Sequence, residues 1–267
     1  ILKKGGNAID AAIGVSFALA VVHPGAGNIG GGGFMVIRTS EGEVTTIDFR
    51  EKAPSNASKD MFLDDSLNVI PGKSWSTSLA AGVPGSVAGM WMAHEKFGTK
   101  PWYDIIRPSI HLAQYGFKLD PLNVSYLNSN YYKSFLSNDE ETRKIFTKKS
   151  NYKIGELFFQ QDLANTLRRI AFSGRDGFYK GETAQNIIKC MDRTNGIITI
   201  EDLEKYEAVE RNPIMFEYKN YKIYSMPPPS SGGIALAGIL KQLENIALDT
   251  ISYHSSDYIH YIVEAER

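Results

Sequence analysis

The sequence predicts a mixed α+β fold, and three observations support this prediction. Residues 8–22 form an almost uninterrupted apolar segment behind an asparagine that can cap it, which is typical of a buried helix. Residues 34–39 and 44–49 are strand-like runs around a short loop with glycine, the pattern of a β-hairpin. Several segments of helical periodicity follow within residues 83–206, and strand-like runs return after them.

Composition and charge set broad limits on function. The 267 residues are 43% hydrophobic and 22% charged, as in an ordinary globular protein. The 29 Lys and Arg nearly balance the 30 Asp and Glu, which leaves a net charge of −1 and gives no reason to expect a nucleic-acid partner. The longest apolar run, residues 11–22, is well short of the about 20 residues that a bilayer requires, so no membrane span is expected.

The predicted hairpin places polar and apolar side chains at defined positions. Residues 34–39 are apolar on both faces, so we expect an inner strand. Side chains alternate between the faces of the return strand, residues 44–49, and Ile47 and Phe49 share one face. The opposite face carries Thr46, Asp48 and Arg50. Arg50 is therefore expected to project from the end of this strand, away from the apolar pair.

The rest of the chain is predicted to be largely helical, after a long loop over residues 51–82. The expected helices cover residues 84–97, 102–115, 122–135, 161–172, 182–191, 199–203 and 234–245. Two further strands are expected at 207–217 and 221–225. Because no repeat, linker or change in composition marks a boundary, we expect residues 1–267 to form a single domain.

Both ends of the sequence resemble interrupted helices. Lysines followed by glycines at residues 3–6 are typical of a helix C-terminus, so the start of this helix is expected to lie before Ile1. Residues 258–267 have helical periodicity and no stop signal. We therefore interpret the chain as an internal segment of a longer protein.

Several kinds of site can be set aside on residue order and spacing. The glycine-rich stretch at residues 25–33 lies between a helix and a strand, whereas a dinucleotide fingerprint runs from strand to glycines to helix. The stretch is instead expected to let a buried strand begin close to other backbone. The five histidines show no metal-binding spacing, so we expect neither a metal nor a cofactor. Cys190 is the only cysteine and is expected to be a buried or half-buried structural thiol.

Arg50 is the strongest candidate for a binding residue. It stands at a strand end within the segment Asp-Phe-Arg-Glu-Lys, residues 48–52. A guanidinium at this position is either a solvated strand end or a fork that donates to a carboxylate, and spacing alone does not decide between them. Glu51 can orient Arg50 or form a surface ion pair with Lys52.

Several motifs, taken together and in order, resemble the γ-glutamyltranspeptidase family. They occupy residues 5–12, 23–33, 48–54 and 224–233, with support from residues 82–89 and 178–181. The resemblance implies an N-terminal-nucleophile hydrolase with a four-layer αββα sandwich, of which this chain is most of the large subunit. It also implies that the precursor cleaves itself, so that a threonine becomes the N-terminus of a small subunit and takes up a γ-glutamyl group from glutathione or a related donor.

The resemblance also assigns roles within the chain. Arg50 matches the arginine that binds the α-carboxylate of the γ-glutamyl group, whereas the nucleophilic threonine is expected downstream of Arg267. This chain is therefore expected to contain no catalytic residue and to be inactive alone. The acyl group would pass to water or to an amino acid or peptide, without a cofactor, in a heterodimer of large and small subunits. Bacterial members are usually periplasmic or extracellular.

Two other functions remain open at this point. A cephalosporin or glutaryl acylase of the same superfamily would share the fold and much of this half. A non-catalytic relative would retain the fold and lack the threonine. The sequence of the small subunit would distinguish both from a γ-glutamyl enzyme.

Overall fold

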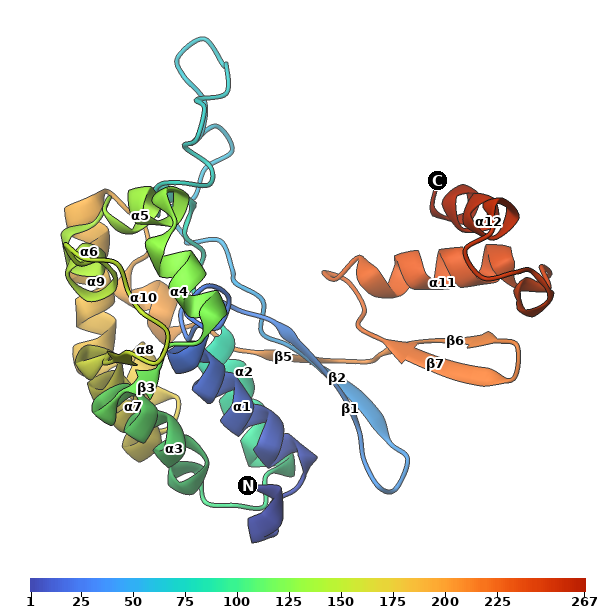
Figure 1. The fold of residues 1–267 in the computed structure, drawn as a ribbon, viewed down its shortest axis with the longest axis horizontal. Helices are drawn as coiled ribbons and strands as arrows, with labels where there is room; N and C mark the ends of the chain where they lie inside the picture. The colour runs from blue at the N-terminus through green and yellow to red at the C-terminus, as the bar shows by residue number, and fades with distance from the viewer. The chain divides into compact units, whose positions relative to one another are not determined.

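The computed structural model describes all 267 residues and has the predicted mixture of helices and strands (Figure 1). Its contacts divide the chain into two compact units. Unit 1 comprises residues 1–32 and 50–207, and unit 2 comprises residues 33–49 and 208–267. Each unit joins two stretches that are separate in the sequence. The expectation of a single domain stays a prediction.

Unit 1 is mainly helical. Its helices are α1 (Ala8–Val22), α2 (Ser86–Phe97), α3 (Trp102–Tyr115), α4 (Pro121–Asn128), α5 (Asn130–Leu136), α6 (Glu140–Phe146), α7 (Gln161–Ser173), α8 (Asp176–Tyr179), α9 (Gly181–Thr194) and α10 (Ile200–Glu204). Two short 3₁₀ helices, η1 (Leu2–Lys4) and η2 (Ser78–Ala80), and a small antiparallel pair, β3 (Phe117–Lys118) with β4 (Leu157–Phe158), complete it.

The core of unit 1 forms where α1, α3 and α7 pack together. Phe17 of α1 is fully buried and meets the ring of Trp102 edge-on, with 5.6 Å between the ring centroids. The Trp102 indole N–H donates to the carbonyl of Ile170 at 2.9 Å, which satisfies its one polar group. Burial of each such large side chain contributes about 1.5–3 kcal/mol, so this contact holds the helical layer together.

The N-terminus of α1 is fixed by a capping box. Asn7 accepts from the N–H of Asp10, and the Asp10 carboxylate accepts from the N–H of Asn7, both at 2.9 Å. Asp10 is fully buried and also accepts from the N–H and hydroxyl of Thr99, at 3.0 and 2.6 Å. Burial raises the pKa of Asp10, but these hydrogen bonds outweigh burial and hold it below its usual value. Asp10 thus joins α1 to the segment after α2.

Unit 2 contains two antiparallel sheets and two helices. The strands are β1 (Phe34–Arg38), β2 (Val44–Asp48), β5 (Val209–Arg211), β6 (Ile214–Tyr218) and β7 (Tyr221–Ser225). The first three form a sheet in the order β1-β2-β5, and β6 pairs with β7. The helices are α11 (Gly232–Leu243) and α12 (Ser256–Glu266), with a 3₁₀ turn, η3 (Leu248–Thr250), between them.

Strand β2 is the central strand of the three-stranded sheet and is buried on both faces. Ile47 is fully buried on one face, as is Thr46 on the other, where its hydroxyl donates to the carbonyl of Arg211 at 2.8 Å. Asp48 forms an ion pair with the Arg211 guanidinium at 2.9 Å. On the polar face predicted for this strand, Thr46 and Asp48 are therefore buried and paired, whereas Arg50 is exposed.

Most helices match their predicted positions, and α3 has the predicted bounds. The prediction of one helix over residues 122–135 was wrong, because Ser129 is extended (φ −64°, ψ 132°) and separates α4 from α5. The prediction that residues 34–39 form an inner strand was also wrong within this chain. Strand β1 lies at the edge of its sheet, and Val36 is 46% exposed. Apolar residues on two faces identified a strand but not its place in the sheet.

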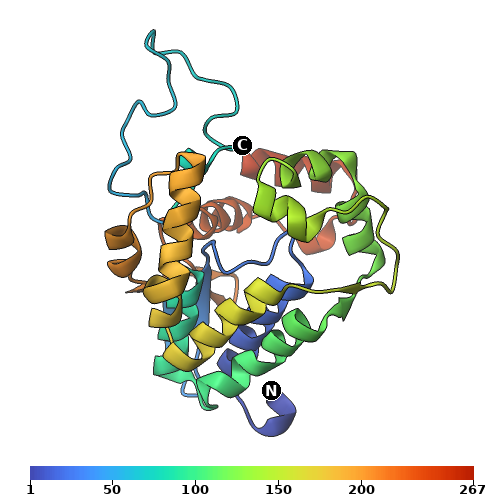
Figure 2. The ribbon, with the colours of Figure 1, turned by 90° about the vertical axis from the view of Figure 1, so that its left-hand side faces the viewer.

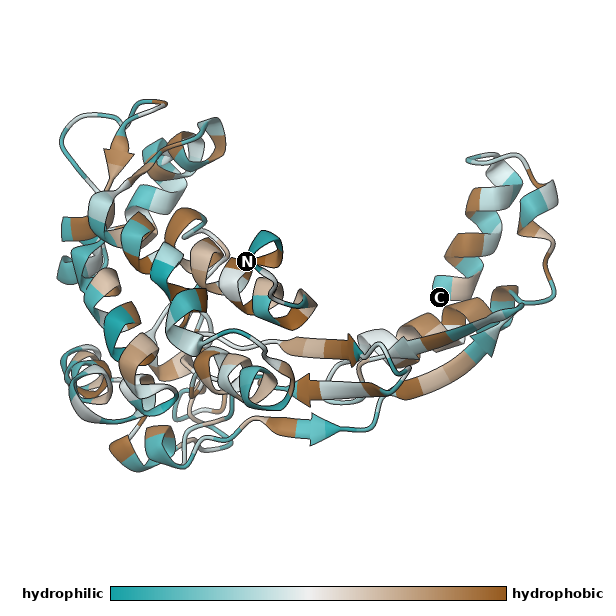
Figure 3. Ribbon diagram, turned by 90° about the horizontal axis from the view of Figure 1, so that it is seen from below, coloured by the Kyte–Doolittle hydropathy of each residue, from teal (hydrophilic) through white to brown (hydrophobic).

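The predicted loop over residues 51–82 is confirmed apart from the short η2, and it extends from the helices of unit 1 as an irregular arm (Figures 1 and 2). Hydrophobic residues occur along helices and strands of both units (Figure 3). None of the helices combines the length and the apolar character that crossing a membrane requires.

The buried carboxylate of Asp10 provides a test of stability. We expect Asp10→Asn to lower the free energy of unfolding of the full-length protein by about 2–4 kcal/mol at pH 7, because buried donors lose a charged acceptor. Since the folded-state pKa of Asp10 is depressed, this contribution is present above its unfolded pKa and is lost as the pH falls through the folded value. Urea unfolding of both proteins at several pH values measures the difference.

Asp64 provides the matched control. It accepts hydrogen bonds from Ser66 and Asn68 within the exposed loop, so Asp64→Asn should cost much less stability. Equal losses in the two variants, or a loss at Asp10 that does not shrink in acid, would contradict this account of the capping box.

Candidate functional site

Arg50 lies two residues after the end of β2, which ends at Asp48, and it is exposed. Its main chain leads into a short bridge between Lys52 and Val83. The N–H of Val83 donates to the carbonyl of Lys52 at 2.8 Å, and the N–H of Lys52 donates in return at 3.3 Å. The segment that carries the guanidinium is therefore held against the residues that precede α2.

A buried tyrosine fixes the main chain of Arg50 itself. The hydroxyl of Tyr206 donates to the carbonyl of Arg50 at 2.7 Å. Tyr206 is 2% exposed, and its ring is stacked on that of Tyr179 with 5.8 Å between centroids and 5° between the planes. A hydrogen bond from a buried, packed side chain restrains the strand end more firmly than one from a mobile side chain.

Tyr179 connects this pair to the start of α2. Its hydroxyl donates to the carbonyl of Pro84 at 2.7 Å and accepts from the N–H of Ala88 at 3.3 Å. Burial raises the pKa of Tyr179 far above its ordinary value, so the phenol remains protonated and can donate. The guanidinium of Arg175 lies over the Tyr179 ring at 4.7 Å and donates to the carbonyl of Tyr206.

The charged neighbours of Arg50 do not pair with one another. The Lys52 ammonium donates to the carbonyl of Glu207 at 2.9 Å and lies 5.0 Å from the centre of the Tyr206 ring. The structure records no ion pair between Glu51 and Lys52, which was one of the two roles considered for Glu51. The Glu51 side chain instead lies next to Gly82, where an added Cβ would come within 2.8 Å of the Glu51 Cβ.

The glycine-rich stretch makes close backbone contacts, as predicted. The carbonyl of Gly31 accepts from the N–H groups of Gly85 and Ser86 at 2.7 and 2.9 Å. These are N–H groups at the start of α2, which have no partner within the helix. A Cβ on Gly27 would lie 2.3 Å from the Leu19 carbonyl oxygen. The stretch thus connects the end of α1 with the start of α2, on one side of the Arg50 segment.

A cavity of about 420 Å³ lies within unit 1 beside this stretch. Gly30 and Gly82 line one side of it, and residues of α7, α8 and α9 line the others. Cys190 is half-buried in its wall, which confirms the expected environment of this thiol. The lining is mostly apolar, and Arg169 on the wall is engaged by Thr183 and Glu182.

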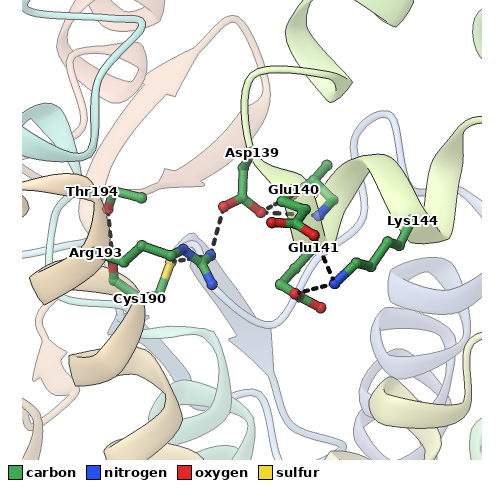
Figure 4. A network of polar contacts seen from close by, with 8 residues as sticks. Asp139, Glu140, Glu141, Lys144, Cys190, Arg193 and Thr194 are labelled. Atoms are coloured by element: carbon green, nitrogen blue, oxygen red, sulfur yellow. Dashed lines mark hydrogen bonds and ion pairs between the residues drawn. The ribbon is translucent and has the colours of Figure 1, made fainter.

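A second, polar cavity of about 510 Å³ is bordered by α6, α7 and α9. Figure 4 shows the contacts at its edge, where the Arg193 guanidinium of α9 pairs with Asp139 at 2.5 Å. Asp139 also caps α6, and the N–H of Thr142 holds the pKa of Asp139 below its usual value. The ion pair between Arg193 and Asp139 therefore connects α9 with the start of α6. No group of three or more His, Cys, Asp or Glu side chains that could hold a metal ion is present in the chain.

Comparison with known proteins identifies the family. A model of the gamma-glutamyltranspeptidase family matches residues 1–267. The glutathione hydrolase proenzyme of Escherichia coli K12 is 47% identical over 268 residues, and the match covers all of this chain and 46% of that protein. The chain belongs to the gamma-glutamyltranspeptidase family. The resemblance described above is thereby confirmed.

Solved structures agree with this assignment. The γ-glutamyltranspeptidase of Helicobacter pylori superposes with a TM-score of 0.96 at 48% identity, covering 99% of this chain and 76% of that one. The cephalosporin acylase of Bacillus halodurans is more distant, with a TM-score of 0.77 at 26% identity, covering all of this chain and 48% of that one. These neighbours confirm the expected α+β class of N-terminal-nucleophile hydrolases.

The chain spans about half the length of the curated γ-glutamyltranspeptidase relatives that it matches. Among its own residues, the sequence identified Arg50; Tyr179 lies in the supporting motif at residues 178–181, but nothing in the sequence linked Tyr179 or Tyr206 to Arg50. These tyrosines lie more than 100 residues away along the chain, and single buried aromatics have no motif that connects them to a distant strand end.

The glycine contacts around the site provide a second test. We expect Gly82→Ala to destabilise the full-length protein by about 1–3 kcal/mol, because the new methyl group would lie 2.8 Å from the Cβ of Glu51. The main chains at both positions are held by the adjacent bridge between Lys52 and Val83, so they cannot move apart freely. Gly30→Ala is the matched control, since an added Cβ there meets nothing within 4 Å. Thermal unfolding of both variants measures the effect, and equal stabilities would contradict the packing described here.

Proposed function

We propose that the protein containing this chain transfers γ-glutamyl groups from glutathione and related donors to water or to amino acids and peptides. The family match over residues 1–267 supports this most directly, together with 47% identity to a protein named glutathione hydrolase proenzyme. The protein is then an enzyme that matures from a proenzyme, and this chain is most of its large subunit. A small subunit, produced by self-cleavage, would supply the nucleophilic threonine.

Arg50 would bind the α-carboxylate of the γ-glutamyl donor. Its side chain is exposed at the end of β2, while its main chain is anchored by Tyr206 and by the bridge at Lys52. A planar guanidinium on a fixed main chain can donate two parallel hydrogen bonds to a carboxylate, which both binds and orients the donor. In this arrangement the chain contributes substrate binding, and it contributes no nucleophile, metal or cofactor.

Three further properties follow from this assignment. The large subunit would form a heterodimer with its own small subunit. The acyl-enzyme would pass its γ-glutamyl group to water or to an amine acceptor. Because bacterial members of the family are usually exported, we propose a periplasmic or extracellular location.

The acylase alternative has weaker support. The cephalosporin acylase of Bacillus halodurans is 26% identical to this chain, whereas the γ-glutamyltranspeptidase of Helicobacter pylori is 48% identical over nearly the same residues. Both share the fold, so it is the higher sequence identity that favours the γ-glutamyltranspeptidase. The γ-glutamyl function is therefore the one that we propose.

Arg50→Ala tests this function. A hydrogen bond to a charged group contributes about 1.5–3 kcal/mol, so we expect kcat/KM of the full-length processed enzyme for a γ-glutamyl anilide to fall by about 10- to 150-fold. Arg50→Lys should not restore it, because an ammonium lacks the planar fork. Steady-state kinetics with hydrolysis of the anilide gives both parameters.

Arg107→Ala is the matched control, since Arg107 is a partly exposed arginine of α3 with only a long surface pair to Asp104. Mass spectrometry of each preparation should first show two fragments, with threonine at the N-terminus of the smaller. A processed wild-type protein with no activity toward γ-glutamyl donors would refute the proposed function. An unchanged kcat/KM in Arg50→Ala would refute the role of Arg50.

A further inference from the structure

We propose that Tyr206 is a positioning residue for Arg50: its buried hydroxyl holds the main chain from which the guanidinium reaches the donor carboxylate. This inference rests on the proposed function, because it concerns how the same binding site is kept in shape. Its direct observation is the 2.7 Å hydrogen bond from the Tyr206 hydroxyl to the carbonyl of Arg50.

The hydrogen bond acts on Arg50, the residue whose orientation decides how the guanidinium meets the donor carboxylate. Arg50 lies between the last residue of β2 and the bridge that pairs Lys52 with Val83. The regular strand ends at Asp48, so its pairing does not include the Arg50 carbonyl. The Tyr206 hydroxyl binds this carbonyl and thereby restrains the dihedral angles between Arg50 and Glu51. A change in those angles would swing the whole side chain.

Tyr206 is suited to this task because it is itself immobile. Its ring is stacked on Tyr179, and its N–H donates to the carbonyl of Leu203, a fully buried residue at the end of α10. The Arg175 guanidinium donates to its carbonyl. The ring, N–H and carbonyl are thus each held by a different neighbour, and the hydroxyl is presented at a fixed point.

The hydroxyl can be separated from the rest of the side chain. Phenylalanine at position 206 would retain the burial and the stacking on Tyr179, both of which come from the ring. It would remove the hydrogen bond to Arg50. If Tyr206 were only a core residue, loss of the hydroxyl would affect stability and leave donor binding unchanged.

Loss of the hydrogen bond should weaken binding of the donor more than it slows the chemical step. A bidentate contact depends on geometry, and small displacements of a binding group reduce it. The reacting carbonyl of the donor lies at the other end of the γ-glutamyl group from the α-carboxylate. We therefore expect the effect to appear mainly in KM.

Kinetics of Tyr206→Phe in the full-length processed enzyme tests the inference. With a γ-glutamyl anilide as donor, we expect KM to rise about 3- to 10-fold, the range of one neutral hydrogen bond, while kcat changes by less than about twofold. Tyr152→Phe is the matched control. Tyr152 is another buried tyrosine of unit 1, 8% exposed, and it packs edge-on against Phe158. Its kinetic constants should equal those of the wild type.

A double variant separates positioning from a general structural effect. If Tyr206 acts through Arg50, then adding Tyr206→Phe to Arg50→Ala should cause no further rise in KM. An additive effect, or a fall in kcat with KM unchanged, would overturn the inference. If Arg50→Ala impairs the enzyme and Tyr206→Phe does not, this inference fails while the proposed function stands. If Arg50→Ala itself has no effect, the proposed role of Arg50 and the inference about Tyr206 are both refuted.

Discussion

The stacked pair of Tyr206 and Tyr179 is the constraint on which the candidate site depends. One hydroxyl holds the carbonyl of Arg50, and the other holds the carbonyl of Pro84 just before α2. Because both rings are buried and parallel, the two hydroxyls are presented at fixed points. Within unit 1, the pair therefore sets the position of the Arg50 main chain relative to the start of α2, and Arg175 contacts both tyrosines in turn.

Close backbone contacts complete this arrangement within unit 1. The Gly31 carbonyl binds the N–H groups at the start of α2, and Gly82 leaves room for the Glu51 side chain. An added Cβ would lie 2.3 Å from the Leu19 carbonyl oxygen at Gly27 and 2.8 Å from the Glu51 Cβ at Gly82, so larger side chains at these two positions would push the segments apart. The glycine-rich stretch is therefore a packing element next to the site, which explains why its order of helix, glycines and strand differs from that of a nucleotide-binding loop.

Local signals in the sequence predicted most of the elements, because capping and periodicity act over a few residues. Asn7 with Asp10 and Thr199 with Asp202 form the capping boxes that begin α1 and α10. The break at Ser129 was missed, since apolar periodicity continues across it. The two compact units have no local signal in the sequence, because each of them joins stretches that are distant along the chain. Arg50 was recognisable from its motif, whereas the tyrosines that hold it are brought close only by the fold.

The central claim is that Arg50, held at its main chain by Tyr206, binds the α-carboxylate of the γ-glutamyl group. A crystal structure of the processed enzyme with L-glutamate tests it most directly. The account predicts two guanidinium nitrogens of Arg50 at hydrogen-bond distance, about 2.7–2.9 Å, from the α-carboxylate oxygens, with the Tyr206 hydrogen bond intact. A glutamate whose α-carboxylate is bound by other residues, with the Arg50 guanidinium turned away, would contradict it.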